Sequence, residues 1–201
     1  MRVLFLRRFA FVTLALAMIA GHPARAWAQR PTPRSIAVPV EPIPQTLIEA
    51  LLTEPNVVVV ADYYWVDTRF GPNLRIDAMI VDAVDAKTRV KGARVQVRDP
   101  ESRGRQDGTS YIDLDELIKL SRGLTTMMEL APKWTFDERR ATESGITTAG
   151  GFRLAVRQFA RVPRAFLSTG LIDPVVTSIE VADLPTLKHA FDQAIAILNG
   201  K

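Results

Sequence analysis

The sequence predicts an α+β fold, a mainly antiparallel β-sheet, open or curled into a half-closed barrel, with helices packed on one side. Between residues 57 and 98, segments rich in alternating apolar residues follow one another with no helical pattern between them. Strands that are consecutive in this way pair antiparallel. Two stretches with apolar residues three and four positions apart, one mid-chain and one C-terminal, predict the helices.

Residues 1–28 have the pattern of a cleavable secretory signal peptide. Arginines at Arg2, Arg7 and Arg8 precede an apolar run of 11 residues at 10–20. That run is shorter than the roughly 20 residues of a membrane-spanning helix. Cleavage after Ala26 and cleavage after Ala28 both fit the small-residue rule, and an uncleaved N-terminal anchor is the alternative. We therefore expect an exported protein, periplasmic or extracellular.

Removal of this segment changes the charge of the chain. The whole sequence has 26 basic and 22 acidic residues, and residues 1–28 hold four arginines and no acid. The remainder therefore balances 22 basic against 22 acidic residues, which gives no reason to expect a nucleic-acid partner. The absence of cysteine excludes both disulfides and a lipid-modified cysteine.

An extended leader and one domain follow the signal peptide. Residues 29–44 contain five prolines, which fix φ and give up the backbone N–H, so this leader is neither helix nor central strand. Residues 45–201 are expected to form a single α+β domain. It begins with a short helix within 45–53, because Ile48, Leu51 and Leu52 are spaced three and four apart before Pro55.

The first strands are predicted from residues 57–98. In 57–67 the odd positions are all apolar or aromatic and are expected to face inward; they are Val57, Val59, Ala61, Tyr63 and Trp65. In 74–85 the alternation changes parity, which predicts a β-bulge near 79–81. In 90–98 the inward residues are Ala93, Val95 and Val97.

The second half alternates a helix, strands and a helix. We expect a polar loop at 99–110 and a short strand at 111–112. A helix follows that starts at Asp113, with Glu116 placed for a capping box. Gly123 within this helix disfavours a single unbroken helix. Strands are expected at 134–143, 152–159, 162–168 and 175–181. The last helix, 183–198, carries an apolar stripe of Leu184, Leu187, Phe191, Ala194 and Leu198.

The composition of the chain excludes several kinds of catalytic, metal and phosphate-binding site. After cleavage one histidine is left, His189, which lies off the apolar stripe of the last helix and is expected on the surface. Without cysteine, a Cys-His nucleophile and a Cys/His zinc site are excluded, and the glycine-rich phosphate-binding motifs are missing. We expect no catalytic residue, metal ion or cofactor.

Two polar groups leave alternatives open. Asp113, Asp115 and Glu116 are the closest set of acids and are the basis of the alternative function, a carboxylate-based hydrolase. The same acids also suit the N-terminus of a helix. Glu143 with the threonines at 147 and 148 either lines a site or forms a polar turn.

Tyr63 and Trp65 are the candidate binding residues. If the sheet curls, these side chains line an apolar cavity; if it does not, they pack in the core. The sequence thus favours a periplasmic or secreted binding or interaction module, for a small apolar ligand or a protein of the cell envelope. The sequence favours binding over enzymatic activity, and no stable membrane span after cleavage is expected.

Three motifs, the segment YIDLDEL at 111–117, Glu143 and the segment TAGGF at 148–152, resemble uncharacterised secreted domains of bacteria. The resemblance covers residues 45–200 in the order of the elements. It implies a bacterial envelope protein and carries no activity or site residues.

Overall fold

The computed structural model describes residues 45–99, 107–138, 140–159 and 161–201. The chain divides into two units, residues 1–41 and 42–201, and all described residues belong to the second. The predicted signal peptide and proline-rich leader therefore lie outside the described residues.

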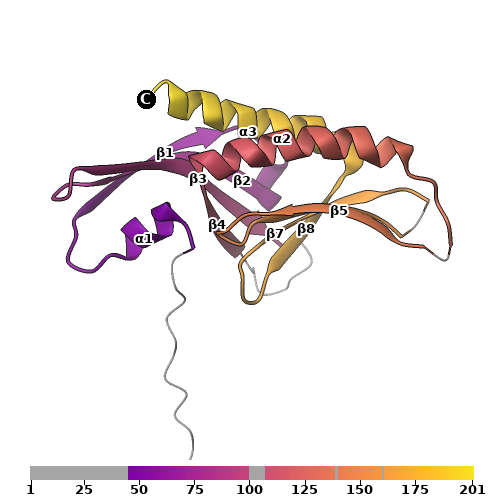
Figure 1. Cartoon of the computed structure of the whole chain (residues 1–201), viewed down its shortest axis with the longest axis horizontal. Helices are drawn as coiled ribbons and strands as arrows, with labels where there is room; N and C mark the ends of the chain where they lie inside the picture. The colour runs from indigo at the N-terminus through magenta and orange to yellow at the C-terminus, as the bar shows by residue number, and fades with distance from the viewer. Residues whose placement is uncertain (1–44, 100–106, 139, 160) are drawn as a thin grey trace, which may run out of the picture. The chain divides into compact units, whose positions relative to one another are not determined.

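Within the second unit, four strands followed by a long helix occur twice (Figure 1). Sheet 1 consists of β1 (Val59–Val66), β2 (Leu74–Ala83), β3 (Thr88–Arg98) and β4 (Asp107–Asp113). Sheet 2 consists of β5 (Thr142–Thr147), β6 (Arg153–Gln158), β7 (Arg164–Thr169) and β8 (Val175–Glu180). The helices are α1 (Leu47–Thr53), α2 (Leu114–Leu130) and α3 (Leu184–Asn199), with 3₁₀ turns η1 (Gly71–Asn73), η2 (Ala131–Lys133) and η3 (Val181–Asp183). Each sheet is antiparallel in chain order, so the predicted α+β class is confirmed, with two open sheets and no closed barrel.

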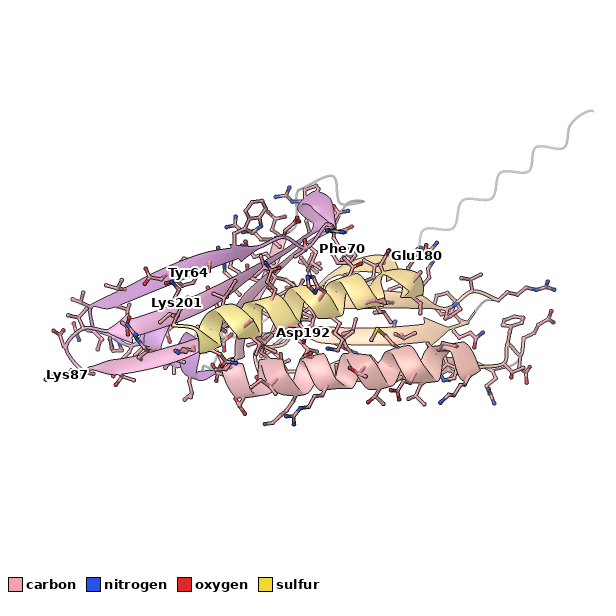
Figure 2. The ribbon with its side chains drawn as sticks, turned by 90° about the horizontal axis from the view of Figure 1, so that it is seen from above. Tyr64, Phe70, Lys87, Glu180, Asp192 and Lys201 are labelled. Carbon is pink, nitrogen blue, oxygen red and sulfur yellow. The ribbon has the colours of Figure 1, made fainter. Side chains whose placement is uncertain are left out.

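The main core lies between the sheets and the pair of long helices. Helices α2 and α3 lie side by side, in opposite directions, over one face of the sheets (Figures 1 and 2). Buried residues of both sheets and both helices form one continuous cluster. It contains the whole predicted stripe of α3, namely Leu184, Leu187, Phe191, Ala194 and Leu198. The prediction of a C-terminal helix packed on the sheet is therefore confirmed.

A polar contact joins the two helices. Ser121 of α2 donates a hydrogen bond to Asp192 of α3, and Lys188 pairs with the same carboxylate at 2.6 Å (Figure 2). Burial would raise the pKa of Asp192, but the hydrogen bonds from Lys188 and Ser121 outweigh it and lower that pKa. Both long helices are thus held together by packing and by one shared carboxylate.

The two sheets also contact each other directly. A Cβ on Gly108 of β4 would lie 2.2 Å from Oγ1 of Thr169 and 2.8 Å from Cβ of Val175, so only glycine allows this approach to β7 and β8. The hydroxyl of Ser110 accepts a hydrogen bond from the backbone N–H of Gly170 at 3.2 Å. Sheet 1 and sheet 2 therefore share an interface as well as a core.

A second, smaller core lies on the opposite face of sheet 1. There Ile48 and Leu51 of α1 pack against Met79, Val81 and Ala83 of β2. The predicted short helix is confirmed, and its first turn is closed by a capping box between Thr46 and Glu49.

This second core explains two departures from the sequence predictions. The predicted bulge near residues 79–81 is absent, because β2 pairs with β1 and β3 in unbroken register. The apolar residues of β2 occupy both even and odd positions because Ile80 faces α2 and α3, whereas Met79 and Val81 face α1. The inward direction of the odd positions of β1 is confirmed only in part: Val59 and Ala61 pack on the second core, Trp65 is exposed, and it is Tyr64 and Val66 that pack on the main core.

Other predictions fail at element boundaries. Asp113 is the N-cap of α2 but its side chain makes no capping bond, and α2 continues unbroken through Gly123. The prediction of a strand at 134–143 is wrong: an isolated bridge between Asp137 and Arg140 lies in this segment, and β5 begins only at Thr142. The alternation in 90–98 and the strands near 152–159, 162–168 and 175–181 are confirmed.

Candidate functional site

The outer face of sheet 1 is the face turned away from α2 and α3, and α1 covers part of it. Across this face Trp65 pairs with Asp77, Asp77 with Arg94, and Arg94 with Tyr111. Residues directly opposite each other on antiparallel strands project to the same side of the sheet. These four side chains therefore form one row, which we call the Asp77 row.

Asp77 is the buried centre of this row. Its side chain is 0% exposed and accepts hydrogen bonds from Nε of Arg75, at 3.0 and 3.1 Å to its two oxygens. It also accepts from Nε and Nη2 of Arg94, at 3.1 and 2.7 Å. Two guanidinium groups thus share one carboxylate, and the cluster has an excess of one positive charge.

Aromatic rings border the cluster on both sides. The Arg94 guanidinium carbon lies 4.1 Å from the centroid of the Tyr63 ring, a cation–π contact. Burial raises the pKa of Tyr111; the nearby Tyr63 adds to this rise, and Arg94 acts against it. Tyr111 is therefore a neutral hydrogen-bonding group at neutral pH, and Arg94 is held in place by Asp77 and Tyr63.

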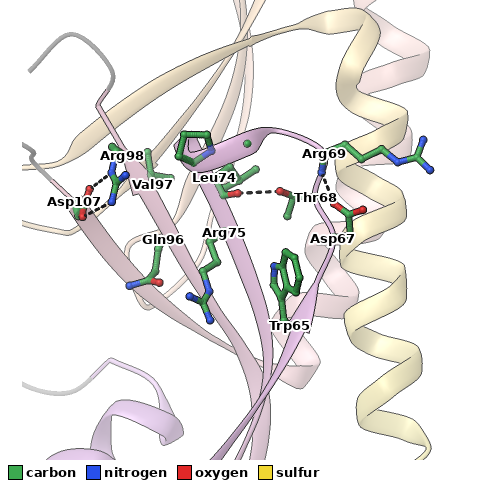
Figure 3. Close-up of a pocket in the computed structure, with 12 residues that line it drawn as sticks. Trp65, Asp67, Thr68, Arg69, Leu74, Arg75, Gln96, Val97, Arg98 and Asp107 are labelled. Carbon is green, nitrogen blue, oxygen red and sulfur yellow. Dashed lines mark hydrogen bonds and ion pairs between the residues drawn. The ribbon is translucent and has the colours of Figure 1, made fainter.

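A pocket of about 790 Å³ opens at the end of this face, where β1 turns into β2 (Figure 3). Trp65, Arg75 and Gln96 project from three adjacent strands on its side of the sheet. The other residues that line it are Asp67, Thr68, Arg69, Gly71, Pro72, Leu74, Val97, Arg98 and Asp107. The lining combines one exposed indole with several hydrogen-bonding groups.

Internal hydrogen bonds fix the shape of the rim. The hydroxyl of Thr68 donates to the carbonyl oxygen of Leu74 at 2.9 Å, and Asp67 accepts from the backbone N–H of Arg69 at 3.0 Å. Arg98 forms a two-point ion pair with Asp107, at 2.7 and 3.1 Å. The turn from β1 to β2 is thus held by side chain–backbone bonds, and the far wall by an ion pair.

The structure places the two predicted binding residues on this face, in different surroundings. Trp65 is 73% exposed and lines the pocket. Tyr63 is 42% exposed and lies against Arg94, and it is not among the residues that line the pocket. Neither side chain faces the main core, so neither lines a cavity enclosed between sheet and helices.

The three acids considered for hydrolysis point to three different partners. Asp113 accepts from the backbone N–H groups of Leu47 and Ile48 at the start of α1, at 2.8 and 3.2 Å. Asp115 pairs with Lys119 one turn along α2, at 2.9 Å. Glu116 accepts from the backbone N–H of Ala149 at 3.0 Å. This arrangement supports the fold and brings no two of these carboxylates to a common reacting centre.

Glu143, the fourth candidate acid, lies on the outer face of sheet 2. It pairs with Arg153 and Arg157. Burial alone would raise the pKa of Glu143, but these two hydrogen bonds lower it. Thr148 closes the polar turn before β6, where its hydroxyl accepts from the backbone N–H of Phe152 at 3.2 Å. The polar-turn interpretation therefore holds for Thr148, whereas Glu143 and Thr147 belong to strand β5.

Sequence reasoning missed the polar centre of the site. Arg75 and Asp77 alternate with apolar residues at 74–78 of β2, and Arg94 lies between Ala93 and Val95 of β3, so each was identifiable as an outward residue. Their meeting depends on the register of β2 and β3, which pairs residues 17 positions apart. The only indication in the sequence was a charged residue, Asp77, between the apolar residues Ile76 and Ala78.

In the parts of the chain that the structure describes, no group of three or more metal-ligating side chains comes together. None of the helices described is long and apolar enough to cross a membrane. No protein-family model, curated protein or solved structure matches the chain.

Proposed function

We propose that this chain is an exported binding module, periplasmic or secreted, whose small-molecule site is the Trp65 pocket on the outer face of sheet 1. The observation that carries the proposal is a tryptophan 73% exposed at a pocket of about 790 Å³. An indole in this position exposes a large apolar surface to water, and a flat ligand that stacks on it removes that surface from water.

The support around Trp65 is consistent with a preformed site. The pocket borders a sheet whose β2 and β3 are buried against two cores, and the hydrogen bonds of Thr68 and Asp67 hold its rim. A rigid wall lowers the entropy cost of binding. The pocket is lined by both polar and apolar groups, so the ligand is expected to be a ring with polar substituents.

The proposal is tested with the full chain, exported in its own host so that processing takes place. The purified protein is incubated with the small-molecule extract of the host envelope and examined by native mass spectrometry. We expect an added non-covalent mass on the wild-type protein that Trp65→Ala reduces at least tenfold, because stacking on the indole is lost.

Phe159→Ala is the matched control, since Phe159 is an aromatic residue of similar exposure, 62%, beside Phe166 of sheet 2. It is expected to keep the added mass. The proposal is wrong if the wild-type protein acquires no mass, or if Trp65→Ala acquires as much as the wild type.

A further inference from the structure

We infer that the ligand of the Trp65 pocket carries a carboxylate, which Arg75 binds while Trp65 stacks on the adjoining ring. This inference rests on the proposed function and adds the chemical class of the ligand. It is derived from the balance of charges around Asp77 and from the direction in which Arg75 is held.

The positive charges near the pocket are not equally available. Arg98 is engaged in a two-point ion pair with Asp107. Arg94 is only 19% exposed, and it lies between Asp77 and the ring of Tyr63. Figure 3 shows the guanidinium of Arg69 directed away from Trp65 and Arg75. Among the described residues that line the pocket, Arg75 is thus the cation available to an anion.

Asp77 fixes the orientation of Arg75 and leaves the terminal nitrogens of its guanidinium available for a ligand. Both contacts to Asp77 are made by Nε, and the side chain of Arg75 remains 53% exposed. Among the described residues, no hydrogen bond is formed by Nη1 or Nη2 of Arg75. A guanidinium with its terminal nitrogens free and its orientation fixed suits two-point recognition of a planar carboxylate.

The register of β1 and β2 places the terminal nitrogens of Arg75 close enough to Trp65 for one ligand to contact both. Trp65 is directly opposite Asp77, so Arg75, two residues before Asp77, is its diagonal neighbour across the strands. Diagonal neighbours are about 7–8 Å apart, a span that a six-membered ring with one carboxylate substituent covers. Gln96 is directly opposite Arg75 on β3 and adds an amide on the same side of the sheet.

The test uses three pairs of an acid and its neutral amide, which have nearly the same shape: benzoate and benzamide, cyclohexanecarboxylate and its amide, and glucuronate and glucuronamide. Each is titrated calorimetrically into the full chain. We expect at least one acid to bind about tenfold more tightly than its amide, the lower range for a hydrogen bond to a charged group. Arg75→Gln is expected to abolish that preference and to leave the affinity for the amide unchanged.

Arg164→Gln serves as the matched control, because Arg164 is an arginine on the outer face of sheet 2 with the same exposure, 52%, and one carboxylate partner, Glu180. It is expected to preserve the preference for the acid. Equal affinities for acid and amide, a preference that survives Arg75→Gln, or no binding of any of the six compounds would each overturn the inference. The envelope-extract experiment tests the proposed function separately. A neutral ligand whose binding depends on Trp65 would support the proposed function and contradict the inference of a carboxylate.

Discussion

At the scale of the residue, Asp77 links the stability of sheet 1 to the chemistry of its outer face. It is a fully buried carboxylate on a strand, and its charge is acceptable there only because Arg75 and Arg94 donate to it. The same contacts direct Arg75 to the pocket and Arg94 to Tyr63. One side chain therefore serves both packing and binding.

Asp77→Ala is expected to destabilise the protein by about 3 kcal/mol, because removing one partner of a buried ion pair leaves the other charge uncompensated. The effect belongs at the lower end of the known range, since Arg75 is half exposed and can be solvated. Urea unfolding of the full chain, followed by far-UV circular dichroism, measures the change.

Asp82→Ala provides the comparison within the same strand. Asp82 pairs with a single arginine, Arg89, at 2.7 Å, and solvent reaches both side chains, which are 29% and 54% exposed. Exposed pairs contribute about 0–1 kcal/mol, so this variant is expected to unfold close to the wild-type midpoint. Equal losses in the two variants would show that burial of Asp77 does not determine its contribution.

At the scale of the element, α1 is held to sheet 1 by a contact that is distant in sequence. A helix of seven residues is too short to be stable alone. The Asp113 carboxylate accepts two of its first backbone N–H groups, and a Cβ on Gly92 would lie 2.5 Å from Cδ1 of Ile48. Docking of α1 therefore depends on the end of β4 and on a glycine of β3.

Asp113→Ala is expected to free α1 locally, because two backbone donors lose their acceptor at a cost of about 1–3 kcal/mol. Hydrogen exchange of the amides in Leu47–Thr53 should accelerate at least fivefold, whereas exchange in β6 and β7 should not change. Asp115→Ala, which removes only the exposed pair with Lys119, is the control and should leave α1 protected. Unchanged exchange in α1 of the Asp113 variant would contradict this role.

The elements that the sequence predicts best are those with one buried face. The stripe of α3 and the alternation of Ala93, Val95 and Val97 face the main core, and their periodicities are sufficient. Strand β2 is buried on both faces, so its pattern is ambiguous and indicated a bulge that is absent. Strand β1 is an edge strand with Tyr64 and Val66 on the main core and Val59 and Ala61 on the second core, so alternation alone did not show which side faces the long helices.

The candidate site was predictable only in part, for a related reason. Trp65 was identifiable from residue type alone, since an aromatic residue in a strand either packs or binds. Asp77 and Arg94 are separated by a turn and most of a strand, and only the pairing of β2 with β3 brings them together. Local sequence patterns indicate which side chains point outward, and long-range register determines which of them meet.

At the scale of the described unit, the two repeats of four strands and a helix share one core. Leu154 of β6, Ile76 of β2 and Leu124 of α2 belong to the same buried cluster, and β4 packs directly on β7 and β8. Residues of both sheets and of both long helices are thus buried together. This shared burial predicts that the sheets unfold together in a single cooperative transition.

Leu154→Ala tests that coupling from the half of the unit that lacks the binding site. Leu154 is fully buried, so the variant is expected to lose about 2–5 kcal/mol from the lost methyl groups and the cavity they leave. If the core is shared, the slowest-exchanging amides of β2 and β3 should lose as much protection as those of β6 and β7, and urea should give one transition for every probe. Loss confined to sheet 2, or two separate transitions, would show that the sheets are independent. The pocket should then retain its ligand in a protein whose second sheet has already unfolded, an outcome that the shared core does not allow.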